Sequence, residues 1–499
     1  MGRLGTKTLT ELGLSPVASL GSGKLDTRVT GLSVDSRKVA EGHLFAALPG
    51  TQAHGADFVP AALKAGAAAI LTDRLGAQRA AEAIAAYQPA VVLAEDPRQA
   101  LAYTAALWFE RQPEVVAAVT GTNGKTSVAT FTRQIWTLLG LEAVNIGTTG
   151  VEGAFETGSG HTTPEPITLH NILHDAWEHG VTHAAMEASS HGLAQRRLDG
   201  VRLAAAAFTN FTQDHLDYHA TFEEYFAAKA GLFARVLPED GVAVINIDDP
   251  RGPEIEGYAA ERNIDVLRVG RSEAADLRLI AQRFDATGMD VRFDFAGTPY
   301  QTRLNLIGGF QAENIMLSAG LAMACGAEPD RIFECLHDLK GVRGRMQHAA
   351  TRDNGAAVFV DYAHTPDAVA TAIKALRPHV MGRIIAVIGA GGDRDRTKRP
   401  LMGAAAAEHA DVVIVTDDNP RSEDPAAIRA EILVACASAL EVGDRAEAIL
   451  RGVDALQAGD ALLICGKGHE TGQVVGDDVF PFDDVEQASL AVAALDGAI

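Results

Sequence analysis

Residues 115–127 read Val-Val-Ala-Ala-Val-Thr-Gly-Thr-Asn-Gly-Lys-Thr-Ser, and this stretch decides the fold. Its first five residues are apolar, which predicts a buried strand. After the stretch, apolar residues recur at helical spacing at Val128, Phe131, Ile135, Leu138 and Leu139. We therefore expect a helix there that Gly140 ends. A strand, a glycine-rich turn and a helix in this order are typical of a parallel α/β unit.

The turn between this strand and this helix suits phosphate groups. Gly121 and Gly124 let backbone N–H groups approach a phosphate without an intervening Cβ. Lys125 can reach the terminal phosphates, and the Thr126 hydroxyl can bind Mg²⁺. Val119 stands where the general phosphate-loop pattern has its first glycine, and an ordinary glycine turn is the alternative interpretation. The nucleotide-binding residues predicted here are Gly121, Thr122, Asn123, Gly124, Lys125, Thr126 and Ser127.

The chain divides into three blocks, because a single core rarely grows beyond about 250–300 residues. We place the blocks at residues 1–112, 113–345 and 346–499. The first block contains an Ala-rich helix predicted over 59–69 and a strand over 69–72. The last block alternates apolar strands with helical stretches, which favours a parallel sheet. Its predicted strands cover residues 357–360, 384–388, 412–415 and 461–464.

Composition excludes several kinds of partner. The formal net charge is -22, and an acidic chain repels phosphodiester backbones, so we expect no nucleic-acid partner. No run of about 18 uncharged apolar residues predicts a membrane span, and the first residues lack the pattern of a secretion signal. The four cysteines, which form no Cys-x-x-Cys pair, are Cys325, Cys335, Cys436 and Cys465. We expect buried reduced thiols in a cytoplasmic protein.

A second set of residues suits metal chemistry. His183-Ala-Ala-Met-Glu187 predicts a strand that ends in an acid, where Glu187 can reach a phosphate-bound Mg²⁺. The Ser-Ser-His that follows lacks the Gly-x-Ser-x-Gly surroundings of a hydrolase nucleophile, which disfavours a hydrolase. His215 and His219 lie four residues apart and could bind zinc on a helix. They lack the His-Glu-x-x-His glutamate, and the phosphate loop favours Mg²⁺.

The sequence Gly121-Thr-Asn-Gly-Lys-Thr-Ser127 resembles the ATP-binding loop of the Mur ligases and the folylpolyglutamate synthetases, which also lack the first glycine. The resemblance to Mur ligases runs over roughly residues 30–475, with the motifs in the family's order. It implies an α/β fold of three domains. These are a small N-terminal α/β domain that binds UDP, a central domain with a P-loop ATPase-like parallel sheet, and a C-terminal Rossmann-like domain that binds an amino acid.

The resemblance also implies metal and nucleotide ligands. It implies a Mg²⁺ ligand at His215 and a CO₂-modified lysine at Lys229, since carbamylation turns a cation into an anion that can hold Mg²⁺. It implies nucleotide contacts at Asn314 and Arg345, with Gln311 where the family usually has asparagine. The implied catalytic residues are Lys125, His215 and Lys229. The implied metal ligands are Thr126, Glu187, His215 and Lys229.

Two further segments resemble those that hold a UDP-linked muramoyl-dipeptide in the family. Gly31-Leu-Ser-Val-Asp-Ser-Arg37 and Gly50-Thr-Gln-Ala53 resemble uridine-diphosphate-binding segments, although as bare sequence they are only loops. The implied contacts of the diphosphate end are Val34, Ser36, Thr51, Gln52 and Ala53. The implied contacts of the dipeptide are Thr162, Thr163, Ser189, Gln195 and Arg197. An arginine such as Arg197 suits a carboxylate.

The C-terminal block resembles the amino-acid site of the family. There the specificity loop is Asp418-Asn-Pro-Arg421, although a bare Asp-Asn-Pro-Arg predicts only a turn. Arg421 can bind a carboxylate with two hydrogen bonds, which favours diaminopimelate over lysine. A dinucleotide fingerprint at 389–394 lacks its third glycine, which disfavours NAD. The implied contacts are Arg394, Asp418, Asn419, Pro420, Arg421, Gly466 and Glu470.

The resemblance implies a monomeric ligase of peptidoglycan precursor synthesis. The enzyme would use ATP and Mg²⁺ to join meso-2,6-diaminopimelate to UDP-N-acetylmuramoyl-L-alanyl-D-glutamate through an acyl phosphate. Because separate domains carry the two substrates, we expect domain closure during turnover. A ligase that adds glutamate to folate is one alternative, and the UDP-type segments argue against it. A phosphate-loop ATPase that drives conformational work, indifferent to a UDP-sugar, is the other.

Overall fold

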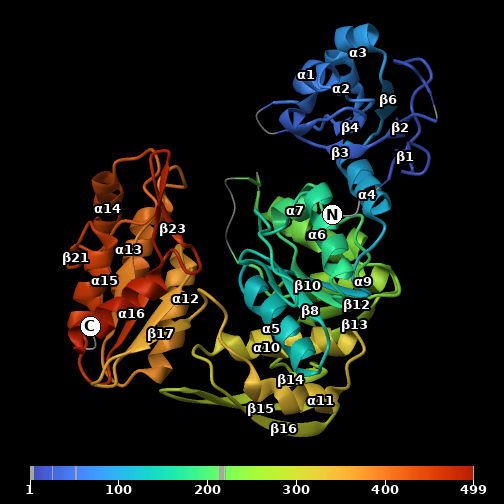
Figure 1. Ribbon diagram of the computed structural model, residues 1–499. Coiled ribbons are helices and arrows are strands. Elements are labelled where there is room, and N and C mark those ends of the chain that lie inside the picture. The colour runs from blue at the N-terminus through green and yellow to red at the C-terminus, as the bar shows by residue number, and fades with distance from the viewer. Residues whose placement is uncertain (1–4, 25, 51–52, 213–217, 220, 498–499) are drawn as a thin grey trace.

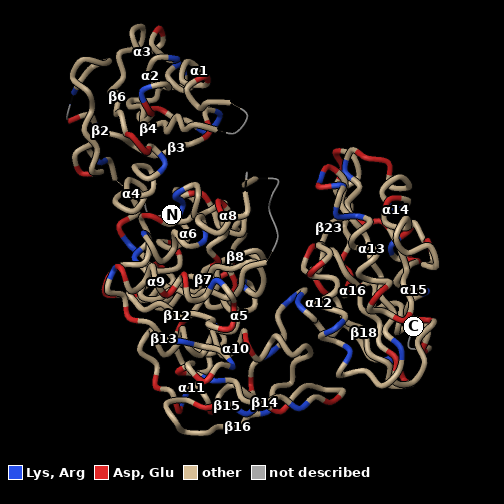
Figure 2. Tube along the Cα trace, turned by 180° about the vertical axis from the view of Figure 1, so that it is seen from behind, with Lys and Arg blue, Asp and Glu red and all other residues tan. Residues whose placement is uncertain are grey.

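The computed structural model describes residues 5–24, 26–50, 53–212, 218–219 and 221–497. The chain forms three bodies in sequence order, each built on its own sheet (Figure 1). The N-terminal body lies at one end of the central body, and the C-terminal body lies beside the central one, in both views (Figures 1 and 2). The predicted α/β class and the three-domain architecture are confirmed. The boundaries at 112 and 345 stay predictions.

The N-terminal body has a parallel sheet in the order β3-β4-β5-β6. Its strands are β3 Gly31–Ser33, β4 His43–Ala46, β5 Ala69–Thr72 and β6 Ala90–Leu93. Its helices are α1 Val59–Lys64, α2 Arg74–Arg79, α3 Ala81–Tyr87 and α4 Pro97–Phe109, and a short pair, β1 Lys7–Thr8 and β2 Arg28–Val29, lies outside the sheet. The helix predicted over 59–69 was too long. It ends at Lys64 because Gly66 adopts a left-handed φ of 98°, which lets the chain turn into β5.

The central body has a sheet in the order β16-β15-β14-β13-β12-β11-β7-β10-β8-β9. Its parallel strands are β7 Val115–Thr120, β8 Ala143–Gly147, β10 His183–Glu187, β11 Ala205–Phe208, β12 Val242–Asn246 and β13 Asp265–Gly270. The strands that add antiparallel pairs are β9 Gly150–Gly153, β14 Leu277–Asp285, β15 Gly288–Phe295 and β16 Thr298–Leu304. Sequence analysis missed these antiparallel additions. The carboxyl ends of the parallel strands meet at one edge, where α/β sheets bind ligands.

Helices cover both faces of the central sheet with two separate apolar cores. They are α5 Lys125–Leu138, α6 Pro166–Glu178, α7 Ser190–Ala194, α8 Phe222–Gly231, α9 Gly252–Glu261, α10 Phe310–Ala324 and α11 Pro329–Cys335. Buried Phe131, Ile135 and Trp136 pack α5 against the sheet on the same face as α10. Gly140, with φ 84°, ends this helix region as expected.

The C-terminal body has a sheet in the order β17-β18-β22-β19-β20-β21, parallel except for β17. Its strands are β17 Gln347–Thr351, β18 Ala357–Asp361, β19 Ile384–Ile388, β20 Val412–Val415, β21 Leu440–Glu441 and β22 Ala461–Cys465, with a hairpin of β23 Gly472–Val475 and β24 Asp478–Pro481. Its helices are α12 Pro366–Leu376, α13 Lys398–His409, α14 Pro425–Leu433, α15 Arg445–Asp454 and α16 Asp484–Leu495. The four strands predicted here lie within β18, β19, β20 and β22.

All four cysteines are free thiols. Cys436 and Cys465 are buried, but Cys325 and Cys335 are only partly buried, so the prediction of four buried thiols was half wrong. In the part of the chain that the structure describes, every helix is too short or too polar to cross a membrane.

We predict that the fold of the C-terminal body depends on Arg445. Its guanidinium makes two 2.7 Å hydrogen bonds to the Asp484 carboxylate, and both side chains are fully buried. Arg445→Met would leave that carboxylate buried and unpaired, which costs roughly 3–5 kcal/mol. Arg451→Met, on the same helix, breaks a half-exposed pair with Glu447 and should cost less than about 1 kcal/mol. Calorimetric melting of both variants checks this, and similar losses in the two would contradict it.

Candidate active site

A cavity of about 680 Å³ opens where the carboxyl edge of the central sheet faces the C-terminal body. The central body contributes the phosphate loop, the ends of β10 and β11, and residues of α8 and α10. The C-terminal body contributes Asp361 at the end of β18 and the first turns of α12. The cavity therefore lies at the junction of two bodies, a common position for ligand sites.

The phosphate loop occupies a space that excludes side chains. Gly121 and Gly124 have φ values of 144° and 88°. A Cβ on Gly121 would lie 1.9 Å from Thr209 Oγ1, and one on Gly124 would lie 2.5 Å from Asn314 Oδ1. Lys125 Nζ donates to the carbonyls of Gly121 and Thr122, both at 2.9 Å. The loop thus exposes backbone N–H groups to the cavity and fixes the Lys125 ammonium where it can bind an anion.

The residues implied for the nucleotide base and phosphates lie on either side of this loop. Asn314, in α10, lines the cavity, and its Nδ2 donates to Gln311 Oε1 at 3.0 Å. Gln311 is buried, so its contact in this structure is with Asn314. Arg345 approaches from the segment between the bodies. Its Nη2 donates to Thr126 Oγ1 at 3.1 Å, and its guanidinium lies 4.8 Å from the centre of the Tyr362 ring.

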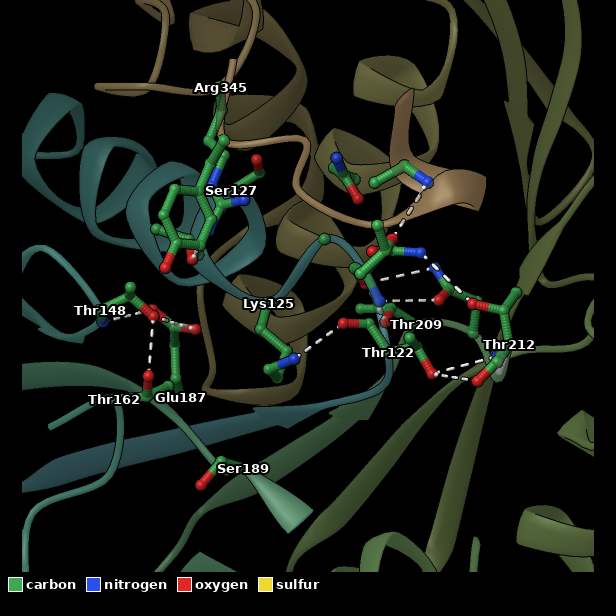
Figure 3. A pocket seen from close by; sticks show the side chains of 18 of the residues that line it. Thr122, Lys125, Ser127, Thr148, Thr162, Glu187, Ser189, Thr209, Thr212 and Arg345 are labelled. Carbon is green, nitrogen blue, oxygen red and sulfur yellow. Dashed lines mark hydrogen bonds between the residues drawn. The ribbon is translucent and has the colours of Figure 1, made fainter. Parts of the chain in front are cut away.

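Oxygen donors suited to Mg²⁺ lie beside the loop. Glu187, only 1% exposed, accepts from Thr148 N at 2.7 Å and from Thr148 Oγ1 at 3.2 Å. Figure 3 shows Thr148 between Glu187 and Thr162, with Lys125 nearby. A carboxylate and the Thr126 hydroxyl are the ligand types that Mg²⁺ prefers, so these residues fit the metal. The described residues contain no cluster of three or more metal-ligating His, Cys, Asp or Glu side chains, and the predicted ligand His215 lies outside them.

Lys229 is buried, contrary to what a lone lysine on an Ala-rich helix suggests. It lies on α8 with 1% exposure. Its Nζ donates to the Gly121 carbonyl at 2.6 Å and lies 4.5 Å from the centre of the Tyr225 ring. Because burying an ammonium is costly, this position needs the compensation that the Gly121 carbonyl and the Tyr225 ring supply. Its position places it under the phosphate loop.

The residues implied for the dipeptide form a connected group at the other side of the cavity. Thr163 Oγ1 donates to the Glu187 carbonyl and accepts from Ser189 N. These two hydrogen bonds tie the segment that carries Thr163 to the end of β10. Arg197 Nη2 donates to Gln195 Oε1 at 2.8 Å. Burial lowers the pKa of the Arg197 guanidinium, although Glu165 opposes this. Thr162, Thr163, Ser189 and Arg197 line the cavity, whereas Gln195 lies just behind them.

The residues implied for the diphosphate end lie in the N-terminal body, away from the cavity lining. Val34 and Ser36 follow β3, and Val34 is 38% exposed. Ala53 precedes the short helix at Gly55–Phe58. Thr51 and Gln52 lie outside the described residues.

The residues implied for the amino acid gather at the carboxyl edge of the C-terminal sheet. Asn419 Nδ2 donates to Glu470 Oε2 at 2.8 Å, and a Cβ on Gly466 would lie 2.5 Å from Asp418 Oδ2. Arg421 has a left-handed φ of 51°, and its Nη1 donates to the Gly392 carbonyl at 2.8 Å. The remaining members of the group are Arg394, which is exposed, and Pro420, which is buried. None of these described residues lines the cavity.

A chain of close contacts links this amino-acid group to the cavity. A Cβ on Gly344 would lie 2.3 Å from His469 N, and the ring centroids of Tyr362 and His469 are 4.9 Å apart. Burial lowers the pKa of His469 to about 4, so this ring is neutral at pH 7. The segment that carries Arg345 therefore packs directly on the loop that carries Glu470.

Sequence analysis missed Thr148, Thr209 and Tyr362. The first two stand just after β8 and β11, so a search for polar residues at the carboxyl ends of parallel strands could have found them. Tyr362 follows β18 in the same way, next to His364, which also lines the cavity. No spacing in the sequence signals that Tyr362 lies beneath Arg345.

Comparisons with known proteins agree with this fold and site. Three family models match: the Mur ligase family catalytic domain at residues 28–109, the Mur ligase middle domain at 119–322, and the Mur ligase glutamate ligase domain at 344–468. UDP-N-acetylmuramoyl-L-alanyl-D-glutamate–2,6-diaminopimelate ligase of Bradyrhizobium diazoefficiens is 48% identical, over 93% of this chain and 95% of its own. That of Caulobacter vibrioides is 46% identical, over 98% and 100%.

Solved structures show the same architecture. A structure of a UDP-N-acetylmuramoyl-L-alanyl-D-glutamate–2,6-diaminopimelate ligase matches with a TM-score of 0.71 and 34% identity, and the match covers 98% of this chain and 99% of that one. A MurF ligase from Thermotoga maritima, solved with ADP, matches with a TM-score of 0.60 at 20% identity, over 94% and 97%, which shows the fold alone.

Fold and site together define an α/β enzyme of the phosphate-loop class, with its nucleotide loop at the meeting of two bodies. The family matches cover most of the chain in the family's domain order. The chain belongs to the Mur ligase family, whose members are ATP-dependent enzymes that form amide bonds.

We predict that the loop tolerates no Cβ at Gly124. Gly124→Ala should weaken ATP binding by at least about tenfold, because the new methyl group would push Asn314 or the loop out of place. Gly140→Ala is a matched control, since Gly140 flanks the same helix with a similar φ of 84° and open space around its Cβ position. Titration calorimetry with ATP checks both variants, and equal affinities would contradict the prediction.

Proposed function

We propose that the chain joins meso-2,6-diaminopimelate to UDP-N-acetylmuramoyl-L-alanyl-D-glutamate at the expense of ATP, in peptidoglycan precursor synthesis. One observation supports this most: a single cavity is lined by the phosphate loop, by Glu187 and by Arg197, so a nucleotide and a carboxylate fit side by side. Relatives of the same length carry this activity in their names.

Some of the cavity residues bind charged groups, and others orient the substrate. Lys125 and the loop N–H groups bind the phosphates, and Arg197 with Thr162, Thr163 and Ser189 orients the dipeptide carboxylate toward them. Thr126 and Glu187, with His215 and the carbamate of Lys229, would hold Mg²⁺, which would neutralise charge on the triphosphate. The D-glutamate carboxylate accepts the terminal phosphoryl group of ATP and becomes an acyl phosphate, and ADP leaves. The neutral amine of diaminopimelate then attacks the carbonyl, phosphate leaves, and the amine proton is lost as the amide forms.

The amino-acid group completes the reaction after the bodies close. Glu470, which Asn419 positions through a hydrogen bond, suits the ammonium of the amino acid, and Arg394 and Arg421 suit its carboxylates. Because these residues lie outside the cavity lining, the C-terminal body rotates toward the phosphate loop during turnover. The segment at Gly344 and Arg345, which packs on the Glu470 loop, serves as the hinge.

The remaining features follow from the same function. Residues 1–112 bind the UDP end through Val34, Ser36 and 51–53, residues 113–345 bind ATP at Asn314 and Arg345, and residues 346–499 bind the amino acid. One chain supplies all these sites, so the enzyme acts as a monomer. It acts in the cytoplasm, where ATP is available.

The function predicts a preference that phosphate release can measure. With ATP and the UDP-linked dipeptide present, meso-diaminopimelate should drive phosphate release and L-lysine should not, because lysine leaves Arg421 without its carboxylate. Arg421→Ala should raise KM for diaminopimelate by about tenfold or more.

Arg396→Ala is the control for Arg421, since Arg396 lies in the neighbouring loop and pairs with Glu431 at the surface. Release driven by lysine alone would refute the amino-acid assignment. Release indifferent to the UDP-linked dipeptide would instead favour a phosphate-loop ATPase that works on a partner.

Carbamylation of Lys229 has a direct spectroscopic test. Incubation with ¹³C-labelled bicarbonate should give a carbamate signal in the ¹³C spectrum of the unaltered chain, because the amine lines the same cavity as Thr126 and Glu187, the residues proposed for Mg²⁺. The Lys229→Gln variant should lack that signal. A Lys125→Gln variant, which removes the other loop lysine, should keep it. An identical spectrum for the Lys229→Gln variant would refute the modification.

A further inference from the structure

Helix α4 connects the N-terminal body to the central body (Figure 1). Its first turn contacts segments of both bodies that belong to the proposed substrate site. On one side, Arg98 donates to the carbonyl of Pro49, directly before the segment 50–53 implied for the diphosphate. On the other side, Asp96 and Gln99 contact the turn 195–199 that carries Gln195 and Arg197.

The contacts with that turn are charged, and one of their carboxylates is buried. Arg196 Nε donates to Asp96 Oδ2 at 2.8 Å, and Gln99 Nε2 donates to Asp199 Oδ2 at 3.2 Å. The Asp199 side chain is 1% exposed, lies 3.8 Å from Arg196 Nη1 and pairs with Arg235. A buried carboxylate with several donors fixes geometry, because moving any partner leaves charge uncompensated. The turn thus presents Arg197 to the cavity and its neighbours Arg196 and Asp199 to α4.

The backbone around this turn is equally constrained. Arg196 adopts a left-handed φ of 61°, which an arginine rarely adopts without compensating contacts. A Cβ on Gly200 would lie 2.4 Å from the Ala102 carbonyl of α4. Beyond the helix, Gln112 and Arg202 exchange hydrogen bonds of 2.9 and 3.2 Å between side chain and backbone. These contacts fix the position of α4 relative to the central body.

We infer that Asp96, Arg98, Gln99, Arg196 and Asp199, together called the α4 junction, set the spacing between the site for the UDP end and the site for the dipeptide end. The inference rests on the proposed function and adds positioning residues to it. A substrate that spans two sites gains affinity only when the sites stand at its own length apart. The junction therefore selects a nucleotide-linked dipeptide over its separate halves.

A Gln99→Glu substitution tests the junction without changing side-chain size. It sets a carboxylate against the buried Asp199 carboxylate and so drives α4 away from the turn. We expect KM for the UDP-linked dipeptide to rise by about tenfold, with kcat within about twofold of the unaltered chain. The affinities for UDP alone and for ATP, measured by calorimetry, should stay unchanged because each uses one body.

Two further variants separate positioning from general damage. Gln99→Met removes the hydrogen bond to Asp199 without adding charge and leaves the Asp199 pair with Arg235 intact, so it should raise KM by less than Gln99→Glu does. Gln78→Glu adds the same charge at an exposed site of the N-terminal body and should leave KM unchanged.

An unchanged KM in the Gln99→Glu variant overturns the inference, and so does a parallel loss of UDP affinity, which would show local damage instead of altered spacing. Turnover by the unaltered chain tests the proposed function separately. An inactive unaltered chain and an indifferent Gln99→Glu variant are therefore distinguishable failures.

Discussion

The carbonyl oxygen of Gly121 is the point on which the nucleotide site depends, because it accepts from two lysines. Lys125 Nζ lies 2.9 Å from this oxygen and Lys229 Nζ lies 2.6 Å from it. The two lysines come from helices α5 and α8, so a single backbone group ties together the loop, its own helix and a helix about a hundred residues further on. The loop is also tightly packed, since Thr209 and Asn314 occupy the space that side chains at Gly121 and Gly124 would need. Its shape is set before any phosphate arrives, which is the preorganisation that phosphoryl transfer requires.

The two outer bodies are held to the central one by different means. Helix α4 is fixed through buried charge at Asp199 and through close backbone contact at Gly200. At the cavity the C-terminal body meets the central one through Arg345, whose guanidinium lies on Tyr362 and bonds to one hydroxyl of the loop. Away from the cavity, His379 bonds to Gly308 N and to the Asp285 carbonyl. A stacked arginine with one neutral hydrogen bond is easier to displace than a buried multi-donor carboxylate. This difference suits a reaction in which one body sets the length of a substrate and the other moves.

The elements that the sequence predicted best have strong local signals. The strand and helix around the phosphate loop, and the four apolar strands after residue 356, follow from runs of apolar residues and glycine stops. The Ala-rich helix was predicted too long because alanine has a high helix propensity. Gly66 ends it through a left-handed backbone angle that composition does not reveal. Strand β15 alternates strictly from Met289 to Phe295 and was overlooked, whereas β14 breaks its alternation where the register shifts between Leu279 and Ala281. Most site residues came from resemblance, since Lys229 or Arg421 as bare sequence is an ordinary surface residue or turn.

The buried contacts that matter most were beyond local signals altogether. Arg345 and Thr126 are 219 positions apart, and Gln99 and Asp199 are 100 apart, so their meeting depends on the whole topology. The net charge of the chain is equally uninformative about the charge of the cavity. The chain carries 65 acidic against 43 basic residues, spread over all three bodies (Figure 2), which would repel a triphosphate. Yet the described residues that line the cavity include the cations Lys125, Arg197 and Arg345, together with Lys229 before carbamylation, against four acids. Anion binding therefore depends on where the fold places its cations and backbone N–H groups, and net charge governs only the approach from solution.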